Sequence, residues 1–244
     1  MTLPLIIIRP EPGASRTHAA ATELGLAAYS FPLFAAMPRA WDAPAPDSFD
    51  ALLLGSANAL RHGGPALADY IGKPAYCVGE ATTRVAWSRG LIVAATGEGG
   101  LQPLLDEVPP EHPRLLRLAG AERVPLDPPP GVEIAERVVY ASVPVPFPLD
   151  LGRVLLASAL PTLVLLLHSG EAARYFLSET ERLGLPHDHI TAITIGPRVS
   201  DICAQAGGWA AILTAPAATD AAMLALAAQT CQIARNGDVG RSRG

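Results

Sequence analysis

The feature of this sequence that most constrains its fold is a series of short aliphatic runs that alternate with helical patterns. Each run is short enough for one strand, and most are followed by a turn signal and then a helical pattern. They lack the apolar/polar alternation of a one-sided sheet, so we expect strands buried on both faces. This order is typical of parallel α/β architecture. The runs cover residues 5–8, 51–54, 76–78, 91–94, 115–118, 138–140, 163–167, 190–195 and 211–213.

Two halves of the chain also repeat one order of motifs. In the first half, a leucine run leads to Ser56 and a second strand leads to Gly79. In the second half, a leucine run leads to Ser169 and a second strand leads to Gly196. The separations are nearly equal, since 169 − 56 = 113 and 196 − 79 = 117. A repeat at nearly constant offset predicts two similar lobes.

Two proline-marked stretches, at about residues 30–38 and 138–146, separate these halves. Proline cannot donate to a strand ladder, so such stretches suit sheet edges or linkers. If both are linkers, one lobe of residues 38–138 is inserted into a discontinuous lobe made of residues 1–33 and 146–244. We therefore predict two α/β lobes joined by two linking segments.

Composition and charge exclude several classes of protein. The 244 residues are 50% hydrophobic and can bury a sizeable core. A net charge of −5 with 18 scattered basic residues argues against a nucleic-acid partner. Three distant cysteines predict neither disulfides nor a zinc site and suit a reducing cytosol. The N-terminus has no secretory pattern, and the longest apolar stretch, 154–167, is shorter than the roughly 20 residues of a membrane span. We expect a cytoplasmic protein without a membrane segment or a metal.

The usual signatures of catalysis are missing from the sequence. No glycine-rich phosphate loop follows the first strand, which ends at Arg9, and there is no nucleophile elbow. His187 and His189 form a conceivable metal pair, but they follow a Gly-Leu-Pro turn in which such residues are usually solvated. Neither nucleotide nor metal chemistry is therefore indicated.

Small polar residues recur instead where strands lead into helices. In parallel sheets these turns gather at the carboxyl edge, where ligands bind and helix N-termini offer free N–H groups to anions. Any single one of them is explained as well by helix capping. Together they predict a polyanionic ligand. The candidates are Ser56, Gly79 with Thr82, Gly99, Gly100, Ser169, Gly196 and Thr219.

An ordered set of motifs resembles the uroporphyrinogen-III synthase family over nearly the whole chain. The set is Arg9-Pro-Glu-Pro12, Gly55-Ser-Ala-Asn-Ala59, Val78-Gly-Glu-Ala-Thr82, Gly97-Glu-Gly-Gly100, Val139-Tyr-Ala-Ser-Val-Pro144, His168-Ser-Gly-Glu-Ala-Ala173 and Ile195-Gly-Pro197. The resemblance implies two flavodoxin-like parallel-sheet lobes joined by a two-stranded linker, with the active cleft between them.

The resemblance also implies the reaction, that of a cofactor-free cyclising lyase of porphyrin (haem) biosynthesis. Its substrate is hydroxymethylbilane, a linear tetrapyrrole with eight carboxylates. Loss of the ring A hydroxyl gives an azafulvene, and ring closure through a spiro intermediate inverts ring D and yields uroporphyrinogen III. The bilane cyclises unaided to the wrong isomer, so the protein chiefly has to position the two ends. A monomeric enzyme is implied as well.

Tyr140 matches the family's tyrosine at the second linker, where its phenol could protonate the departing hydroxyl. Packing at a strand end is the alternative reading of this residue. The resemblance also implies that Thr82, Ser56 and Ser169, which lie in matching turns, contact substrate carboxylates. Helix capping is the competing role of these residues. Many members have threonines where this chain has Arg198 and the valine after it, and Arg198 could pair with a propionate instead.

Three further residues are candidates because of their place at strand ends. His168 could donate to the substrate, although a satisfied buried histidine is the commoner case. Arg9 and Arg117 could each clamp a carboxylate or form a local salt bridge. The alternative function is a non-catalytic two-lobed protein that closes on a small anionic ligand.

Overall fold

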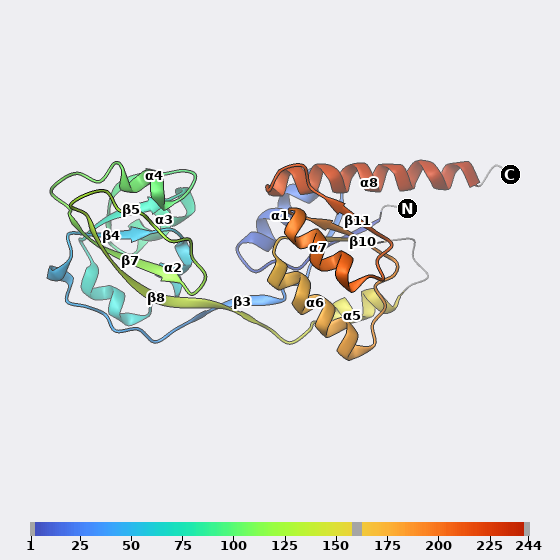
Figure 1. Cartoon of the computed structure of the whole chain (residues 1–244), viewed down its shortest axis with the longest axis horizontal. Helices are drawn as coiled ribbons and strands as arrows, with labels where there is room; N and C mark the ends of the chain where they lie inside the picture. Colours follow the sequence, from blue (N-terminus) through green and yellow to red (C-terminus); the bar gives the residue numbers. More distant parts are fainter. Residues whose placement is uncertain (1–2, 158–162, 242–244) are drawn as a thin grey trace. The chain divides into compact units, whose positions relative to one another are not determined.

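The computed structural model describes residues 3–157 and 163–241, with side chains as far as Cys231. The chain forms two compact units (Figure 1). Met1–Ala35 and Pro144–Gly244 make up the terminal unit, and Ala36–Val143 make up the inserted unit. The chain passes from one to the other along strands β3 (Phe34–Pro38) and β8 (Glu133–Pro144), which are neighbours in one sheet.

The terminal unit is built on a five-stranded sheet in the order β11-β10-β9-β1-β2. Every pairing within it is parallel. This is the strand order of flavodoxin, whose order along the sheet reverses between the first and third strands, here β1 and β9. Its strands are β1 (Pro4–Ile7), β2 (Ala27–Ser30), β9 (Leu163–Leu167), β10 (Ile190–Thr194) and β11 (Ala211–Thr214).

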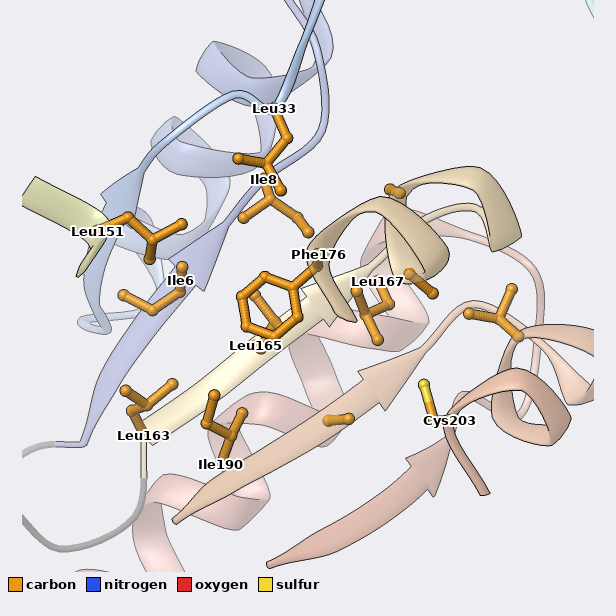
Figure 2. Packing of buried hydrophobic residues seen from close by; sticks show 14 of the residues in the cluster. Ile6, Ile8, Leu33, Leu151, Leu163, Leu165, Leu167, Phe176, Ile190 and Cys203 are labelled. Carbon is orange, nitrogen blue, oxygen red and sulfur yellow. The ribbon is translucent and has the colours of Figure 1, made fainter. Parts of the chain in front are cut away.

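Helices cover both faces of this sheet (Figure 1). Helices α1 (Gly13–Glu23) and α8 (Asp220–Arg241) pack on one face, and α5 (Leu149–Leu156), α6 (Gly170–Leu183) and α7 (Pro197–Ala206) pack on the other. Figure 2 shows Phe176 of α6 at the centre of the second layer, among Ile8, Leu165 and Leu167. Complete burial of such a side chain contributes about 1.5–3 kcal/mol. Each aliphatic strand of this sheet therefore packs against helices on both of its faces.

The inserted unit has a six-stranded sheet in the order β3-β8-β7-β4-β5-β6. The pairings from β8 to β6 are parallel. Counted from β4 along the chain, the order is 3-2-1-4-5, so the reversal lies between β4 and β7. The remaining strands are β4 (Ala51–Leu54), β5 (Pro74–Val78), β6 (Ile92–Gly97) and β7 (Arg114–Gly120).

One face of this second sheet packs on α2 (Ala57–His62), the 3₁₀ segment Pro65–Tyr70 and α3 (Glu80–Ser88). The other face packs on α4 (Leu101–Leu105). A second 3₁₀ segment, Pro46–Ser48, precedes β4. The predicted fold class, two parallel-sheet α/β lobes, is confirmed.

The repeat seen in the sequence corresponds to a repeated series of elements. β4-α2-β5-α3-β6 in the inserted unit has the order of β9-α6-β10-α7-β11 in the terminal unit. Both series tie the second helix to the third strand through hydroxyl groups. Thr83 Oγ1 lies 2.7 Å from Thr96 Oγ1, and Ser200 Oγ lies 2.6 Å from Thr214 Oγ1.

The expectation that every aliphatic run is buried on both faces is wrong for β6. Its residues alternate between exposed and half-buried, and Ile92 is 59% exposed. The cause is its place at the end of the sheet. The prolines of residues 30–38 flank β2 and β3, which are also end strands. Within residues 3–157 and 163–241, no helix has the length and apolar character that a membrane crossing requires.

Candidate functional site

A cavity of about 330 Å³ lies in the inserted unit at the carboxyl ends of β4 and β7. This is the reversal point of the sheet, where open α/β sheets bind their ligands. Gly55 and Ser56, directly after β4, line one side. The last residues of β7, ending at Gly120, line another, and Tyr140 of β8 completes the wall. The topology of the unit thus brings together residues that are far apart in the sequence.

Tyr140 reaches this cavity through an irregularity in the β7–β8 ladder. Ala119 is level with Val138, but Gly120 is level with Tyr140, so the register shifts by one residue. The Tyr140 carbonyl accepts a hydrogen bond from the Ala121 N–H at 2.9 Å. The imidazole of His62, at the end of α2, lies with its centroid 6.1 Å from the phenol ring. The phenol is therefore held among strand and helix ends.

Arg117 is the buried cation of this region, with a side chain 6% exposed. Its Nη1 donates to Glu136 Oε1 at 2.5 Å, and its Nη2 donates to the Val124 carbonyl at 2.9 Å. Arg123 Nε donates to the second oxygen of Glu136 at 2.8 Å. Residues 122–126 line the cavity, so these bonds fix one of its walls. Within the described part of the chain, Arg117 Nε is buried without a hydrogen-bond partner.

The charges around Glu136 determine its ionisation. Burial is the largest single influence and acts to raise the pKa of this carboxyl. The hydrogen bonds from Arg123 and Arg117, with their positive charges, outweigh burial and leave the pKa below its ordinary value. Glu136 is therefore ionised at neutral pH, and the three side chains together carry one net positive charge (2 − 1 = 1).

Other predicted residues of the inserted unit take capping or turn positions. Ser56 is the N-cap of α2, and its Oγ accepts from the Asn58 N–H at 3.2 Å. Gly99 and Gly100 line the cavity with φ of +80° and +121°, values that favour glycine. Thr82 is buried at 3% exposure in the first turn of α3, and it is not among the described residues that line the cavity.

The corresponding reversal point of the terminal unit, between β1 and β9, holds a compact polar cluster. Arg9 and His168 follow those two strands, and both contact Asp220 at the start of α8. His168 Nε2 lies 2.7 Å and Arg9 Nη1 3.3 Å from Asp220 Oδ1, and Thr17 Oγ1 donates to Oδ2 at 2.7 Å. Arg9 is thus engaged in a local salt bridge with this carboxylate.

Burial and charge set the protonation of this cluster. Burial is the main influence on His168 and lowers its pKa, although Asp220 acts in the opposite direction. For Asp220, burial acts to raise the pKa, but the bonds from Thr17 and His168 and the charge of Arg9 leave it lowered. An ionised carboxylate only accepts hydrogen bonds, so the neutral imidazole carries its proton on Nε2.

The remaining predicted residues of the terminal unit lie at the starts of helices. Ser169 caps α6 by accepting from the Ala172 N–H at 3.1 Å, and Thr219 Oγ1 accepts from the Ala222 N–H at 3.2 Å. Gly196 precedes α7, and its carbonyl accepts from the Val199 N–H at 3.0 Å. Arg198 is exposed in the first turn of α7. Their observed bonds are those of helix caps, and contact with a substrate stays a prediction.

Several residues that the structure places at these two sites were not predicted from the sequence, among them Arg123 and Thr17. Gly120 follows an aliphatic run, as the chosen glycines do, so the same signal could have found it. Asp220 follows Thr219 and could have been found as an acid at a helix start. His62 and Glu136 had no distinguishing pattern, because their importance depends on long-range contacts with Tyr140 and Arg117.

Comparison with known proteins gives a family for the chain. The model of the family described as uroporphyrinogen-III synthase HemD matches residues 15–225. No curated protein matches. A mutant form of uroporphyrinogen III synthase from Thermus thermophilus is similar in structure, with 16% identity, 93% of this chain and 99% of that chain covered, and a TM-score of 0.44. The wild-type form has 16% identity, coverage of 97% and 99%, and a TM-score of 0.39. Because the family model spans most of its length, this chain belongs to the uroporphyrinogen-III synthase family.

Proposed function

We propose that this protein converts hydroxymethylbilane into uroporphyrinogen III, with loss of water and inversion of ring D. The observation that carries the proposal is the family match over residues 15–225. The reaction starts when the hydroxyl leaves the hydroxymethyl carbon of ring A, driven by electrons from the pyrrole nitrogen. The resulting azafulvene is attacked by the substituted carbon of ring D, and the spiro intermediate then breaks and recloses with that ring inverted.

Tyr140 is the residue to which we assign acid catalysis. Its phenol lines the cavity, and an O–H donor placed there can hydrogen-bond the departing hydroxyl as negative charge develops on it. The protein does not have to supply a strong nucleophile, because both reacting carbons belong to the substrate. Holding the two ends in the geometry of the type III product is the larger task.

The cavity suits one end of the substrate. A volume of about 330 Å³ is at the small end of ligand pockets, so we assign to it one terminal pyrrole with its acid side chains. Arg117 and Arg123 bring two guanidinium groups to the cavity, and the buried Nε of Arg117, which has no hydrogen-bond partner in the described part of the chain, can donate to such an anion. Ser56 and Gly100 also line the cavity and can add hydrogen bonds from hydroxyl and backbone N–H groups.

The reaction is tested by generating hydroxymethylbilane in situ with its deaminase, adding this protein, oxidising the products and separating the porphyrin isomers. The proposal expects the type III isomer to replace the type I isomer of unaided closure. An unchanged type I product from folded protein would refute it. The same proposal includes a monomer that acts in the cytoplasm without a cofactor, and size-exclusion chromatography tests the monomeric state.

The role of Tyr140 is tested with Tyr140→Phe, which keeps the ring and removes the donor. We expect formation of isomer III to slow on the order of 10²-fold, the usual contribution of a positioned general acid. Tyr29→Phe is the matched control, because that tyrosine is 49% exposed in β2 of the terminal unit. Unchanged turnover in Tyr140→Phe would leave this tyrosine only a packing role.

A further inference from the structure

We infer that Gly120 is a positioning residue that, together with the adjoining bulge in β8, sets the place of the Tyr140 phenol in the cavity. The inference rests on the proposed function. It concerns a cavity-lining residue without a side chain, whose effect on the reaction we assign to its contact with Tyr140.

The bulge decides which way Tyr140 faces. Successive residues of a regular strand point to opposite faces of the sheet. Val139 and Tyr140 are consecutive, yet both pack on the hydrophobic cluster of α2 and α3. The register shift at Gly120 accounts for this, because an extra residue in one strand re-aims the next side chain. A regular ladder would have directed the phenol to the opposite face.

Gly120 then determines how closely the phenol approaches β7. A Cβ atom added at Gly120 would lie 2.8 Å from Tyr140 Cζ and 2.9 Å from its hydroxyl oxygen. Any side chain at this position therefore displaces the tip of the ring. The backbone of Gly120 does not lie in the left-handed region, so its conformation does not require glycine. The contact with Tyr140 is the feature that excludes a larger residue.

The nature of this contact predicts an unusual phenotype for Gly120→Ala. The atoms that clash are at the far end of a side chain that can rotate, and not in the backbone. The protein should therefore fold with nearly unchanged stability while its phenol moves. A displacement of about 1 Å can lower a rate up to about 10²-fold, so we expect isomer III formation to fall by about tenfold or more.

The test is a double-mutant cycle of Gly120→Ala with Tyr140→Phe in the full chain. If Gly120 acts by placing the hydroxyl, Gly120→Ala slows the wild type by about tenfold but adds less than about twofold once the hydroxyl is gone. Gly152→Ala is the control, because a Cβ at that position in the terminal unit would make an ordinary contact with Leu185 Cδ1, at 3.9 Å, and no closer one with the described residues. Thermal unfolding of each variant separates a kinetic defect from a folding defect.

The outcomes distinguish this inference from the function on which it rests. Wild-type protein that leaves only isomer I overturns the proposed function. A wild-type rate in Gly120→Ala, or equal slowing by this change with and without the Tyr140 hydroxyl, overturns the positioning role alone. Gly120→Ser serves as a second variant, since it displaces the ring by a similar amount and must show the same dependence on the hydroxyl.

Discussion

Arg117 keeps a positive charge almost wholly buried in the inserted unit, and Glu136 is the group that compensates it. The two side chains are 6% and 32% exposed, with 2.5 Å between Nη1 and Oε1. Glu136→Leu fills a similar space but removes the compensating charge. The guanidinium of Arg117 then remains buried, and of its two hydrogen-bond partners described above only the Val124 carbonyl is left.

The expected cost follows from burial. Removing one partner of a fully buried ion pair costs about 3–5 kcal/mol because the other charge stays unpaired. Glu136 is about one-third exposed, so water can partly replace it, and we expect about 2–3 kcal/mol. Arg123, at 33% exposed, contributes the outer bond, and Arg123→Ala should cost less than about 1 kcal/mol.

The measurement is urea unfolding followed by tryptophan fluorescence. Trp209→Phe serves as the background, because it leaves Trp41 and Trp87, both in the inserted unit. With a slope of about 1–3 kcal/mol per molar urea, Glu136→Leu should lower the midpoint by about 0.7–3 M, and Arg123→Ala by much less.

Two results would refute the reasoning about this ion pair. One is a Glu136→Leu midpoint no lower than that of Arg123→Ala, which would mean that water solvates Arg117 adequately. The other comes from the double variant Arg117→Met with Glu136→Leu. Removing both charges should recover part of the lost stability, since an apolar pair carries no desolvation cost. Further loss would show that the packing of the arginine stem is the dominant effect.

Three other predictions follow from single residues. Burial lowers the pKa of His168, so the neutral imidazole stabilises the folded protein above the ordinary histidine pKa of about 6.5, and this stability is lost as the pH falls below that value. His168→Gln should therefore make the midpoint of thermal unfolding depend less on pH between about pH 5 and 7. Burial raises the pKa of the Cys77 thiol to about 11, so a disulfide reagent at pH 8 should label it only in urea, and rapid labelling of native protein would contradict this. Gly184 ends α6 with a φ of +63°, whereas Gly152 lies inside α5. In thermal unfolding, Gly184→Ala should lower the stability and Gly152→Ala should raise it, each by about 0.5–1 kcal/mol, and two changes in the same direction would contradict this prediction.

The sequence was most informative about the central strands. The runs 51–54 and 163–167 coincide with β4 and β9, because four or five consecutive aliphatic residues can be buried only between two helical layers. It was least informative about the sheet edges. β2 has the sequence Ala-Ala-Tyr-Ser, with no run and no alternation, and its strand depends on pairing with β1. Edge position is a property of topology, which local sequence does not contain.

Site prediction was limited by the same distinction. Residues at strand ends could be chosen from the sequence, since the carboxyl edge is where ligands bind in such folds. Their partners could not. Glu136 lies 19 positions after Arg117, and Asp220 lies 211 positions after Arg9, so neither contact has a local signal. The bulge that turns Tyr140 is likewise set by the fit between two strands.

The two reversal points show how a repeated fold acquires different sites. In the terminal unit, Asp220 brings a carboxylate to the ends of β1 and β9, and with Arg9 it forms a pair of zero net charge beside a neutral His168. In the inserted unit, two arginines share one Glu136, and Glu122 at the cavity is exposed, where water and salt screen its charge. In both arrangements a carboxylate of the protein already accepts from the nearby cations, so the difference lies in the buried atoms that the described part of the chain leaves without a hydrogen-bond partner. In the inserted unit that atom is Arg117 Nε, a donor, whereas beside Asp220 it is His168 Nδ1, an acceptor in the neutral imidazole. The unused donor therefore favours the cavity beside Tyr140 over the Arg9 cluster for binding a substrate carboxylate.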